Sequence, residues 1–519
     1  VYTARFTAPF PGAQIEAINF RVRCRGPVPQ LSIRGAVAAD TDGKRLKGTR
    51  QAWFDGAWHA TPVYSRYALQ PGDTMAGPAI VEERESTTVV APGDVLTVDA
   101  GSNLCIAVQA TRAAAERITA DMPVAEAAAM IEADPIALEI MWARLVTVVE
   151  EMWLTVCRTA FSLIISESQD FACDLLDPTG EPLAHSPRAM PVFNLTLPLA
   201  VKALLAKFPP EILKPGDVLI TNDPWLCAGH LFDIAIVTPV FRGERLVGLV
   251  GTVGHVSDIG GTKDSMRARE IYEEGIQIPP MKLFKAGAPN EDLFTLIAEN
   301  VRNNEQVLGD LHALVSANAV GAQRLLAFMD EYGIHDLRAL AKIIQDRAEA
   351  AMRAAISAIP DGVYTSTISN NPLGEKLDYP VKITVAGDAL EVDFEGAPPQ
   401  LPQGGYNCTM NYTAAHATYP LKCMLTPNVR GNAGCYRPFT VKAPEGSVLN
   451  CRKPAAVNMR TRVGWYVAPN LFKALSTAIP AQVQANTGLP VAVFVYGLSL
   501  IHISEPTRLR RISYAVFCL

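Results

Sequence analysis

The chain has 519 residues, of which 49% are apolar, and its formal net charge at pH 7 is −6. This length and apolar content suffice for about two to four folded domains and exclude a disordered chain. Charges of both signs are interspersed, with no basic patch that would bind nucleic acid, so we expect a small-molecule partner. The ten cysteines are scattered without a C-x-x-C pair, which indicates free thiols in a reducing compartment, and we expect a cytoplasmic protein.

Neither a membrane span nor a signal peptide is predicted. The longest apolar stretch, residues 489–503, contains Pro, Gly and Ser and is shorter than the roughly 18 residues that a span requires. The chain begins at Val1, with no basic segment followed by an apolar one. We expect this start to be the boundary of a fragment rather than the start of a secreted protein.

Residues 1–108 have the pattern of a small β-rich module. Short β-branched runs separated by Pro, Gly and Asp turns predict strands at residues 15–22, 61–68, 79–81, 87–90 and 95–98. Residues 109–133 are rich in Ala and Glu and contain few large apolar side chains, which is typical of a helical or loosely ordered linker. We therefore place a domain boundary in this linker.

Residues 134–497 are predicted to form a larger domain of mixed helices and strands. Apolar residues at helical spacing predict one long helix over residues 136–165, and strand and turn patterns follow between residues 170 and 261. Helices are predicted next, then strands from 362 to about 442 and a final helix near 465–479. Because the pattern lacks βαβ regularity, we expect an α+β fold. The predicted elements of the middle part are strands at 172–176, 218–221, 234–240 and 246–253, and helices at 290–300, 308–332 and 336–359.

Residues 498–519 differ from the rest of the chain. They cluster arginines within an apolar tail and show no helix or strand period that continues the domain. We interpret them as a non-native tail and leave them out of the predicted fold.

The most informative motif is His-x-x-Asp, which occurs twice, at His230 with Asp233 and at His255 with Asp258. Two β-rich runs lie between the copies and are joined through Arg242-Gly243, which predicts an antiparallel hairpin. If Arg242 and Gly243 form a two-residue loop, His230 lies directly opposite His255. Opposed side chains in such a ladder have Cβ atoms about 4.5–5.5 Å apart.

Two imidazoles and two carboxylates at the mouth of one hairpin match the ligands of Zn²⁺, Mn²⁺ or Fe²⁺. We predict His230, Asp233 and His255 as metal ligands, with a position left for water that the metal would activate. The alternative is structural: each His caps a strand end, and each Asp closes an Asx-turn before a glycine. A β-bulge in the hairpin would break the predicted pairing.

Other polar residues carry weaker signals. Asp223, in Asn222-Asp-Pro224, is interpreted either as part of a turn or as a carboxylate that holds an imidazole in one tautomer. Cys435 has no histidine near it in sequence, and a structural free thiol is the simpler interpretation. The histidines at 185, 312 and 416 are isolated and are interpreted as core or surface residues. No P-loop or G-x-G-x-x-G motif is present, and no substrate-binding residue is predicted.

Several separated motifs in residues 134–490 resemble the hydantoinase B/oxoprolinase family. That family includes N-methylhydantoinase B subunits, the C-terminal half of 5-oxoprolinase and the α subunits of acetone carboxylase-type enzymes. Residues 1–108 resemble the C-terminal end of a hydantoinase A domain through Gly77-Pro-Ala-Ile80, Ser86-Thr-Thr88 and Pro92-Gly93. The motifs of the larger domain are Gln169-Asp-Phe171, Leu213-Lys-Pro-Gly-Asp217, Asn222-Asp-Pro224, Gly229-His-Leu231 with Asp233, Gly254-His255 with Asp258-Ile-Gly-Gly261, Glu274-Gly275 with Pro279-Pro280, Asn300-Val-Arg302 and Asn432-Ala-Gly-Cys435.

The resemblance implies the metal-dependent half of an ATP-dependent hydrolase that opens a hydantoin or a 5-oxoproline ring. It implies a divalent transition metal (Mn, Zn or Fe) on His230, Asp233 and His255, and ATP with Mg²⁺ on a hydantoinase A portion that is largely missing here. Many members carry Gly-His-His where this chain has Gly254-His255-Val256, and the hairpin register favours His255. Asp258 is the candidate general base, or alternatively a residue that orients a ligand. The hydantoinase B-type part is expected to be C-terminally truncated and to work in an oligomer.

Two alternatives to this function stay open. The first is an α-type subunit of an ATP-dependent ketone carboxylase acting on acetone or acetophenone, in which the same pocket brings an enol phosphate and bicarbonate together. The second is a non-catalytic assembly subunit or an inactive fragment, because a fold by itself does not determine a function.

Overall fold

The computed structural model describes residues 44–54, 56–108, 118–119, 121–262 and 265–485. The chain divides into two compact units, with the boundary between residues 115 and 116. The predicted strand at 15–22 and the predicted tail at 498–519 lie outside the described residues. No helix within the described residues is long and apolar enough to cross a membrane.

The smaller unit is strand-rich, as predicted, and consists of two small sheets. Its core is formed by seven buried apolar side chains that include Val81, Val90 and Leu96. The strand predicted at 61–68 begins earlier and ends at Ser65, because Arg66–Ala68 turn into a 3-10 helix. One sheet contains β1 (Leu46–Phe54), β2 (Ala57–Ser65), β4 (Ala79–Glu82) and β5 (Thr87–Val90), and the other contains β3 (Thr74–Ala76), β6 (Val95–Val98) and β7 (Leu104–Ala107).

The larger unit is built on a seven-stranded sheet in which every neighbouring pair is antiparallel. The hairpin of β11 and β12, which the sequence predicts, lies at the centre of this sheet. Most residues of these two strands are buried, including long consecutive runs, which requires cover on both faces of the sheet. In spatial order the strands are β14 (Ala288–Pro289), β13 (Met281–Lys285), β10 (Val218–Thr221), β11 (Asp233–Arg242), β12 (Arg245–His255), β8 (Phe171–Leu176) and β9 (Pro182–His185).

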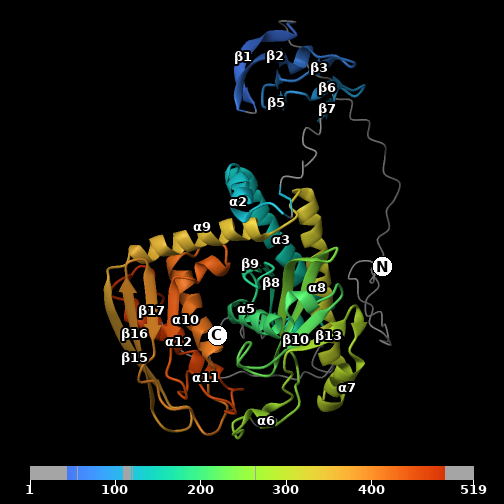
Figure 1. Cartoon of the computed structure of the whole chain (residues 1–519). Helices are drawn as coiled ribbons and strands as arrows, with labels where there is room; N and C mark the ends of the chain where they lie inside the picture. The colour runs from blue at the N-terminus through green and yellow to red at the C-terminus, as the bar shows by residue number, and fades with distance from the viewer. Residues whose placement is uncertain (1–43, 55, 109–117, 120, 263–264, 486–519) are drawn as a thin grey trace, which may run out of the picture. The chain divides into compact units, whose positions relative to one another are not determined.

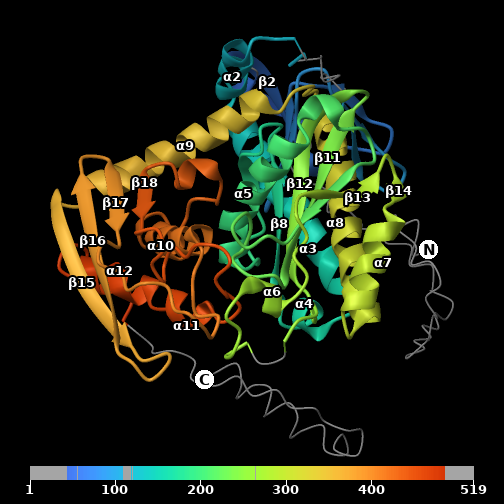
Figure 2. The same ribbon diagram turned by 60° about the horizontal axis from the view of Figure 1, so that its bottom comes forward.

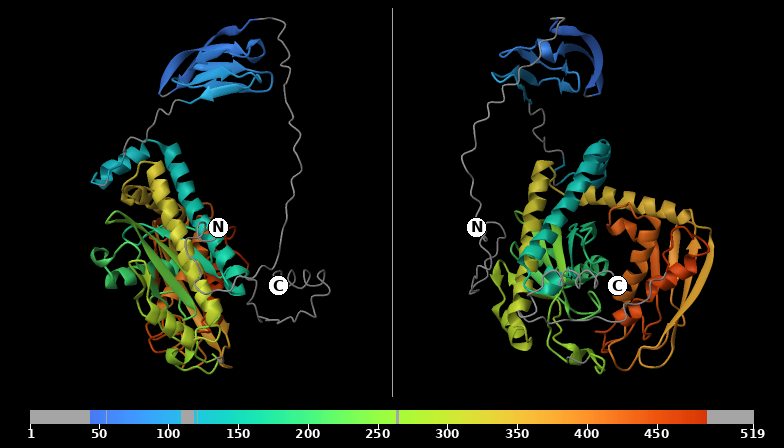
Figure 3. Two further views of the ribbon diagram at one scale, coloured as in Figure 1. Left: turned by 90° about the vertical axis from the view of Figure 1, so that its right-hand side faces the viewer. Right: turned by 180° about the vertical axis from the view of Figure 1, so that it is seen from behind.

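Helices cover both faces of this sheet (Figure 2). On one face α5 (Pro191–Lys207) packs over residues such as Ala235 and Leu249, and on the other α8 (Asn304–Glu331) packs over Ile236 and Val250. The long helix α3 (Pro135–Thr159) packs against α8, and both lie in front of the sheet when the molecule is seen from behind (Figure 3). The remaining helices of this half are α2 (Val124–Glu132), α4 (Leu163–Ser166), η2 (Pro210–Ile212), α6 (Ile271–Glu274) and α7 (Glu291–Asn300).

A second layer extends from the first through α9 (Arg338–Ser357), which runs from the central sheet to a four-stranded sheet (Figure 1). That sheet has the order β15-β16-β17-β18, and its buried face packs with α9, α10 and α12 into one core. Its elements are β15 (Gly362–Asn370), β16 (Leu377–Ala386), β17 (Ala389–Asp393), α10 (Met410–Leu425), η3 (Ala433–Cys435), β18 (Phe439–Lys442), α11 (Thr461–Gly464) and α12 (Val467–Leu475).

Three sequence predictions for this unit are wrong. The regions predicted as strands and turns contain two helices, α5 and α10, and each has a proline inside it, Pro198 and Pro420. An internal proline removes a backbone donor and argues against a helix, but the burial of eight residues in each helix, the proline included, outweighs that local preference. The predicted helix over 136–165 ends at Thr159, and the short helix α4 follows separately.

Two glycines of β12 let the helices approach the central strand. A Cβ at Gly251 would lie 2.9 Å from Leu197 Cδ2 of α5, and a Cβ at Gly254 would lie 3.1 Å from both Leu314 Cδ1 of α8 and Ile165 Cδ1 of α4. Gly254 immediately precedes His255, so the packing of α8 fixes the backbone that carries this histidine.

We predict that Gly254→Val lowers the free energy of unfolding by about 1–3 kcal/mol, because the larger side chain overpacks the contact with Leu314. Leu314→Ala alone costs about 2–5 kcal/mol through the cavity that it leaves. In the double variant the two losses should total less than their sum, with a coupling of about 0.5–3 kcal/mol, measured by urea denaturation. Strictly additive losses would show that Leu314 does not limit the space at position 254.

Candidate metal centre

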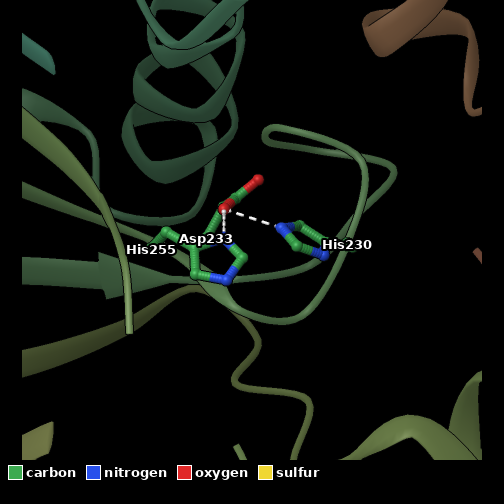
Figure 4. Close-up of side chains that lie close together, drawn as sticks. All are labelled: His230, Asp233 and His255. Atoms are coloured by element: carbon green, nitrogen blue, oxygen red, sulfur yellow. Dashed lines mark hydrogen bonds and ion pairs between the residues drawn. The ribbon is translucent and has the colours of Figure 1, made fainter. Parts of the chain in front are cut away.

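Two strands of the central sheet bring the predicted ligands to one edge. Asp233 is the first residue of β11 and His255 is the last of β12, and the two are direct partners in the antiparallel ladder. His230 lies three residues before β11, in the turn that leads into it. The three side chains point toward one another, with Asp233 between the two imidazoles (Figure 4).

The predicted hairpin register is wrong, although the convergence of the three residues is present. The two-residue loop consists of Gly243 and Glu244, because Arg242 pairs with Arg245 and Gly243 takes a φ of 63° that favours glycine. A bulge next to Val240 shifts the register once more. Asp233, not His230, therefore lies opposite His255.

The turn before β11 holds His230 by close packing. Gly229 has a φ of 92°, and a Cβ there would lie 2.9 Å from Tyr412 Cβ and 3.1 Å from Arg460 Cδ. Only glycine fits both this backbone conformation and this space. The ring of His230 lies 5.6 Å from that of Phe232, which in turn stacks on His255 at 5.3 Å.

The distances within the cluster are short. Asp233 Oδ1 lies 2.7 Å from His230 Nε2 and 3.1 Å from His255 Nδ1. One nitrogen or oxygen atom from each residue lies within 4.8 Å of the others, so together they could hold a metal ion. His230 and Asp233 are buried and His255 is partly exposed, which leaves one side of the cluster open to solvent.

The geometry around His230 Nε2, the nitrogen that faces Asp233, fits a metal ligand better than a hydrogen-bond donor. Although Asp233 Oδ1 is only 2.7 Å away, His230 Nε2 has no partner in hydrogen-bond geometry among the described residues, and it is buried. An imidazole nitrogen left in this way has a lone pair available, and two imidazoles with one carboxylate are a common ligand set for Zn²⁺, Mn²⁺ or Fe²⁺. The residues present therefore fit a divalent transition metal.

The surroundings of the cluster favour the metal-binding protonation states of two of the three ligands, His230 and Asp233. Burial, followed by the positive charge of Arg460, lowers the pKa of His230 to about 4. Burial would raise the pKa of Asp233, but His230 and Arg460 outweigh it and hold this pKa well below its usual range. His230 is therefore neutral and Asp233 ionised near pH 7, as metal binding requires. Burial would lower the pKa of His255, but its hydrogen bond to Asp233 and the charges of Asp233 and Asp170 outweigh this and raise that pKa.

Two residues from the C-terminal part of the larger unit form hydrogen bonds with the cluster, and the sequence predicted neither of them. Asn458 Oδ1 lies 3.0 Å from His230 Nδ1, and Arg460 donates from Nη2 to Asp233 Oδ2 at 2.8 Å. Arg460 also donates from Nε to the carbonyl of Ala228, and its guanidinium stacks 4.6 Å above the ring of Tyr412. No local pattern marks these residues, because more than 220 positions separate them from their partners in sequence.

A buried carboxylate holds this C-terminal segment in place. Glu274, at the end of α6, accepts hydrogen bonds from the backbone N–H groups of Val457 and Asn458, both at 2.9 Å. Burial raises the pKa of Glu274 to about 7 despite these two hydrogen bonds. A Cβ at Gly405 would lie 2.7 Å from Glu274 Oε1, so the contact depends on glycine at that position. Glu274 lies in one of the motifs that carried the family resemblance.

The two other predicted acidic residues lie outside the cluster. Asp258 Oδ1 accepts a hydrogen bond from the Arg302 guanidinium at 2.7 Å, and its other oxygen accepts from the Arg302 backbone. Asp223 accepts from Gln277 Nε2 at 2.6 Å and from the backbone of Trp225, so its bonds go to these groups and not to an imidazole. The residue within hydrogen-bond distance of His230 Nδ1 is Asn458, not Asp223.

Asp170 is an acidic residue at the cluster whose role sequence reasoning missed. Its Oδ2 lies 3.7 Å from His255 Nδ1, and its backbone carbonyl accepts a hydrogen bond from the His255 N–H at 3.0 Å. Burial raises the pKa of Asp170. Asp170 is part of the Gln169-Asp-Phe171 motif, which could have marked it as a candidate site residue. Because this motif is far in sequence from the two His-x-x-Asp motifs, its contact with His255 could not be predicted.

Two family models match the chain. Residues 134–503 match the hydantoinase B/oxoprolinase family model, and residues 1–104 match that of the hydantoinase/oxoprolinase C-terminal domain. The chain is 32% identical to caprolactamase subunit beta of Pseudomonas jessenii, over 70% of this chain and 63% of that protein. It is 31% identical to 5-oxoprolinase 1 of Arabidopsis thaliana, over 85% of this chain and 36% of that protein.

Solved structures show the same fold. The crystal structure of ATP-dependent caprolactamase from Pseudomonas jessenii has a TM-score of 0.62 and 30% identity, covering 67% of this chain and 61% of that one. An acetone carboxylase structure has a TM-score of 0.63 at 20% identity, over 68% of this chain and 50% of that one, and this shows a common fold alone. Since the family model spans most of the chain, the protein belongs to the hydantoinase B/oxoprolinase family.

Proposed function

We propose that this chain provides the metal-dependent half of an ATP-dependent hydrolase that opens a cyclic amide such as a hydantoin or 5-oxoproline. One observation carries the proposal: His230, Asp233 and His255 converge at a sheet edge, and the buried Nε2 of His230 has no hydrogen-bond partner among the described residues. The names of the relatives support the substrate class, because caprolactamase and 5-oxoprolinase both denote enzymes that act on lactams.

A divalent transition metal held by these three residues would polarise the substrate carbonyl and activate water near neutral pH. The chain's own residues prepare the site for it. Asn458 Oδ1 accepts the proton of His230 Nδ1 and so fixes the tautomer that leaves Nε2 free. Arg460 occupies Asp233 Oδ2, which leaves Oδ1 to face both imidazoles.

Two carboxylates are candidates for proton transfer. Asp170 lies against His255, close enough to exchange a proton with a substrate at the open side of the cluster. Asp258 stays a candidate general base from the sequence, but its hydrogen bonds with Arg302 favour a role in anchoring the loop after β12. We therefore assign proton transfer to Asp170 and the anchoring of this loop to Asp258.

ATP belongs, in this proposal, to a hydantoinase A-type portion or partner subunit. The caprolactamase structure is described as ATP-dependent, and the related sequence is called a subunit beta, so an accompanying subunit is expected. That portion would phosphorylate the amide oxygen of the substrate with ATP. The carbonyl carbon activated in this way would then be attacked by water at the metal cluster of this chain. The chain spans only 63% and 36% of the two relatives, so the assembly of the whole enzyme is part of the proposal.

We predict that His230→Ala removes the bound metal. The wild-type chain, purified with Mn²⁺ or Zn²⁺ and freed of loosely bound ions, should retain about one ion per chain, and the variant should retain almost none. Elemental analysis gives the metal content, circular dichroism checks the fold, and His59→Ala in the smaller unit is the matched control. A folded His230→Ala variant with full metal content would exclude His230 as a ligand.

Replacing Asn458 should weaken metal binding without abolishing it. Asn458→Leu removes the acceptor that orients His230, and we expect about 10–100-fold lower metal affinity in a competition titration with a chelator. Asn458→Asp keeps an acceptor oxygen and should retain most of the affinity. If both variants bound metal equally weakly, the contact would be structural and the tautomer of His230 would not depend on it.

The reaction itself is tested with the chain and its hydantoinase A-type portion together. Given ATP and Mg²⁺, we expect phosphate release that depends on a hydantoin, 5-oxoproline or another lactam and yields the ring-opened product by mass spectrometry. Small ketones with labelled bicarbonate are the comparison. Incorporation of label with a ketone, and no ring opening of any lactam, would replace the hydrolase with a ketone carboxylase.

A further inference from the structure

The short helix α6 joins the two layers of the larger unit. At its start, the Ile271 N–H donates to the carbonyl of Pro454 at 2.8 Å, and just after its end the Ile276 N–H donates to the carbonyl of Ile259 at 2.9 Å. Ile259 lies in the loop that follows His255 and β12, and Pro454 precedes segment 457–460, which carries the two cluster partners from the second layer. The last residue of α6 therefore lies between two parts of the chain that must be placed together for the cluster to form.

That last residue is Glu274, which is only 2% exposed. Its two oxygens accept the N–H groups of Val457 and Asn458, both at 2.9 Å. The side chain of Asn458 then reaches in two directions: its Oδ1 lies 3.0 Å from His230 Nδ1, and its Nδ2 donates to the hydroxyl of Ser265. A shift of the Asn458 backbone would therefore change its contact with His230.

The same carboxylate fixes the backbone that leads to Arg460. The Val457 carbonyl accepts a hydrogen bond from the Arg460 N–H at 3.1 Å, so the residue held by Glu274 also begins this turn. On the other side, the Gly405 carbonyl accepts from the Met459 N–H at 2.8 Å, and a Cβ at Gly405 would lie 2.7 Å from Glu274 Oε1. Because the space beside the carboxylate is filled, a change at Glu274 has to be taken up by segment 457–460.

Holding both N–H groups requires the ionised carboxylate. An ionised carboxylate only accepts hydrogen bonds, whereas a protonated one carries a hydrogen on one oxygen and accepts more weakly. Burial raises the pKa of Glu274 to about 7, although its two N–H donors and the positive charge of Arg460 lower it. Glu274 therefore gains or loses its proton near neutral pH. A divalent cation at the cluster would act in the same direction as Arg460 and favour the ionised form.

The charge that links Glu274 to the cluster is that of Arg460, which bonds to Asp233. Glu273 acts in the opposite direction and raises the pKa of Glu274. Burial raises the pKa of Cys451 to about 12, so this thiol stays neutral. The ionisable side chains on the elements around Glu274 are Arg269, Glu270 and Glu273 in and before α6, Tyr406 next to Gly405, Cys451, Lys453 and Arg460 in the C-terminal part, and Asp258 with Arg302 at the loop after β12.

We propose that Glu274 is a positioning residue through which protons regulate the metal centre. Its ionised carboxylate holds Asn458 and Arg460 against the metal ligands, and protonation loosens this hold, so that binding of the metal and protonation of Glu274 oppose each other. The inference rests on the proposed metal centre and adds its regulation: the metal binds more tightly above neutral pH than the protonation of the ligands alone would give.

The first test compares the Zn²⁺ affinity of the whole chain with that of Glu274→Gln, by competition with a chelator. The variant stays uncharged at every pH and resembles protonated Glu274. The two chains should bind alike at about pH 6, and the wild type should bind about tenfold more tightly at about pH 8. Protonation of His255 weakens binding in both chains, so the ratio of affinities reports Glu274. A ratio that is the same at both pH values would indicate a merely structural contact and overturn the proposal.

Asp177→Asn is the matched control. Asp177 is also a buried carboxylate that accepts backbone N–H groups, from Thr179 and Glu181, and burial raises its pKa. It follows β8 at the end away from Asp170, and seven residues of a strand span about 23 Å. This variant should bind Zn²⁺ like the wild type at both pH values. A loss as large as that in Glu274→Gln would assign the effect to the fold as a whole and contradict the proposal.

The second test follows backbone hydrogen exchange of the metal-free chain by mass spectrometry. At about pH 8, Glu274→Gln should speed exchange in the peptide that contains residues 454–460 about tenfold, while the peptide of β11 keeps its rate. Where Glu274→Gln does not fold, Glu274→Asp, which keeps the charge on a shorter side chain, takes its place and should speed the same peptide about threefold.

The two measurements separate this inference from the metal centre itself. If the wild type bound no Zn²⁺ but residues 454–460 exchanged faster in the variant, the proposed metal centre would be rejected, and Glu274 would only join the two layers. If the wild type bound Zn²⁺ and exchange in residues 454–460 were unchanged in the variant, the metal centre would stand and the role of Glu274 would be refuted.

Discussion

The larger unit is organised around one buried carboxylate, that of Asp233, whose partners come from several separate elements. This carboxylate is fully buried, and its two oxygens are shared between His230, His255 and Arg460. A buried charge is stable only when its partners and hydrogen bonds are held in place, because the interior cannot solvate it as water does. Each partner comes from a different element, so the turn before β11, the end of β12 and the C-terminal segment must all be positioned together.

The fold meets this requirement by packing both faces of one sheet and adding a second layer at its side. Helices on each face bury the β11–β12 hairpin, and glycines such as Gly254 let them approach its backbone. The second layer contributes the segment that carries Asn458 and Arg460, and Glu274 ties this segment to the first. The cluster therefore lies at the junction of the two layers.

Sequence reasoning succeeded where structure follows local periodicity. The hairpin strands and helices α7 and α8 follow from apolar patterns that recur every two or every three to four residues. It failed at α5 and α10, where an internal proline argues against a helix and tertiary burial decides. It also misplaced the hairpin register, because a bulge and a loop one residue further along are local choices that the apolar pattern does not specify.

The sequence by itself determined the family and the residues of the candidate cluster, because His230, Asp233 and His255 lie in short motifs at the ends of one hairpin. Only the tertiary structure decided which residues orient them. Asn458, Arg460 and Asp170 reach the cluster from distant parts of the chain, whereas Asp258 and Asp223 form hydrogen bonds elsewhere. The physical reason is that a contact across many tens of residues depends on how the layers pack, and no local spacing of residues records that packing.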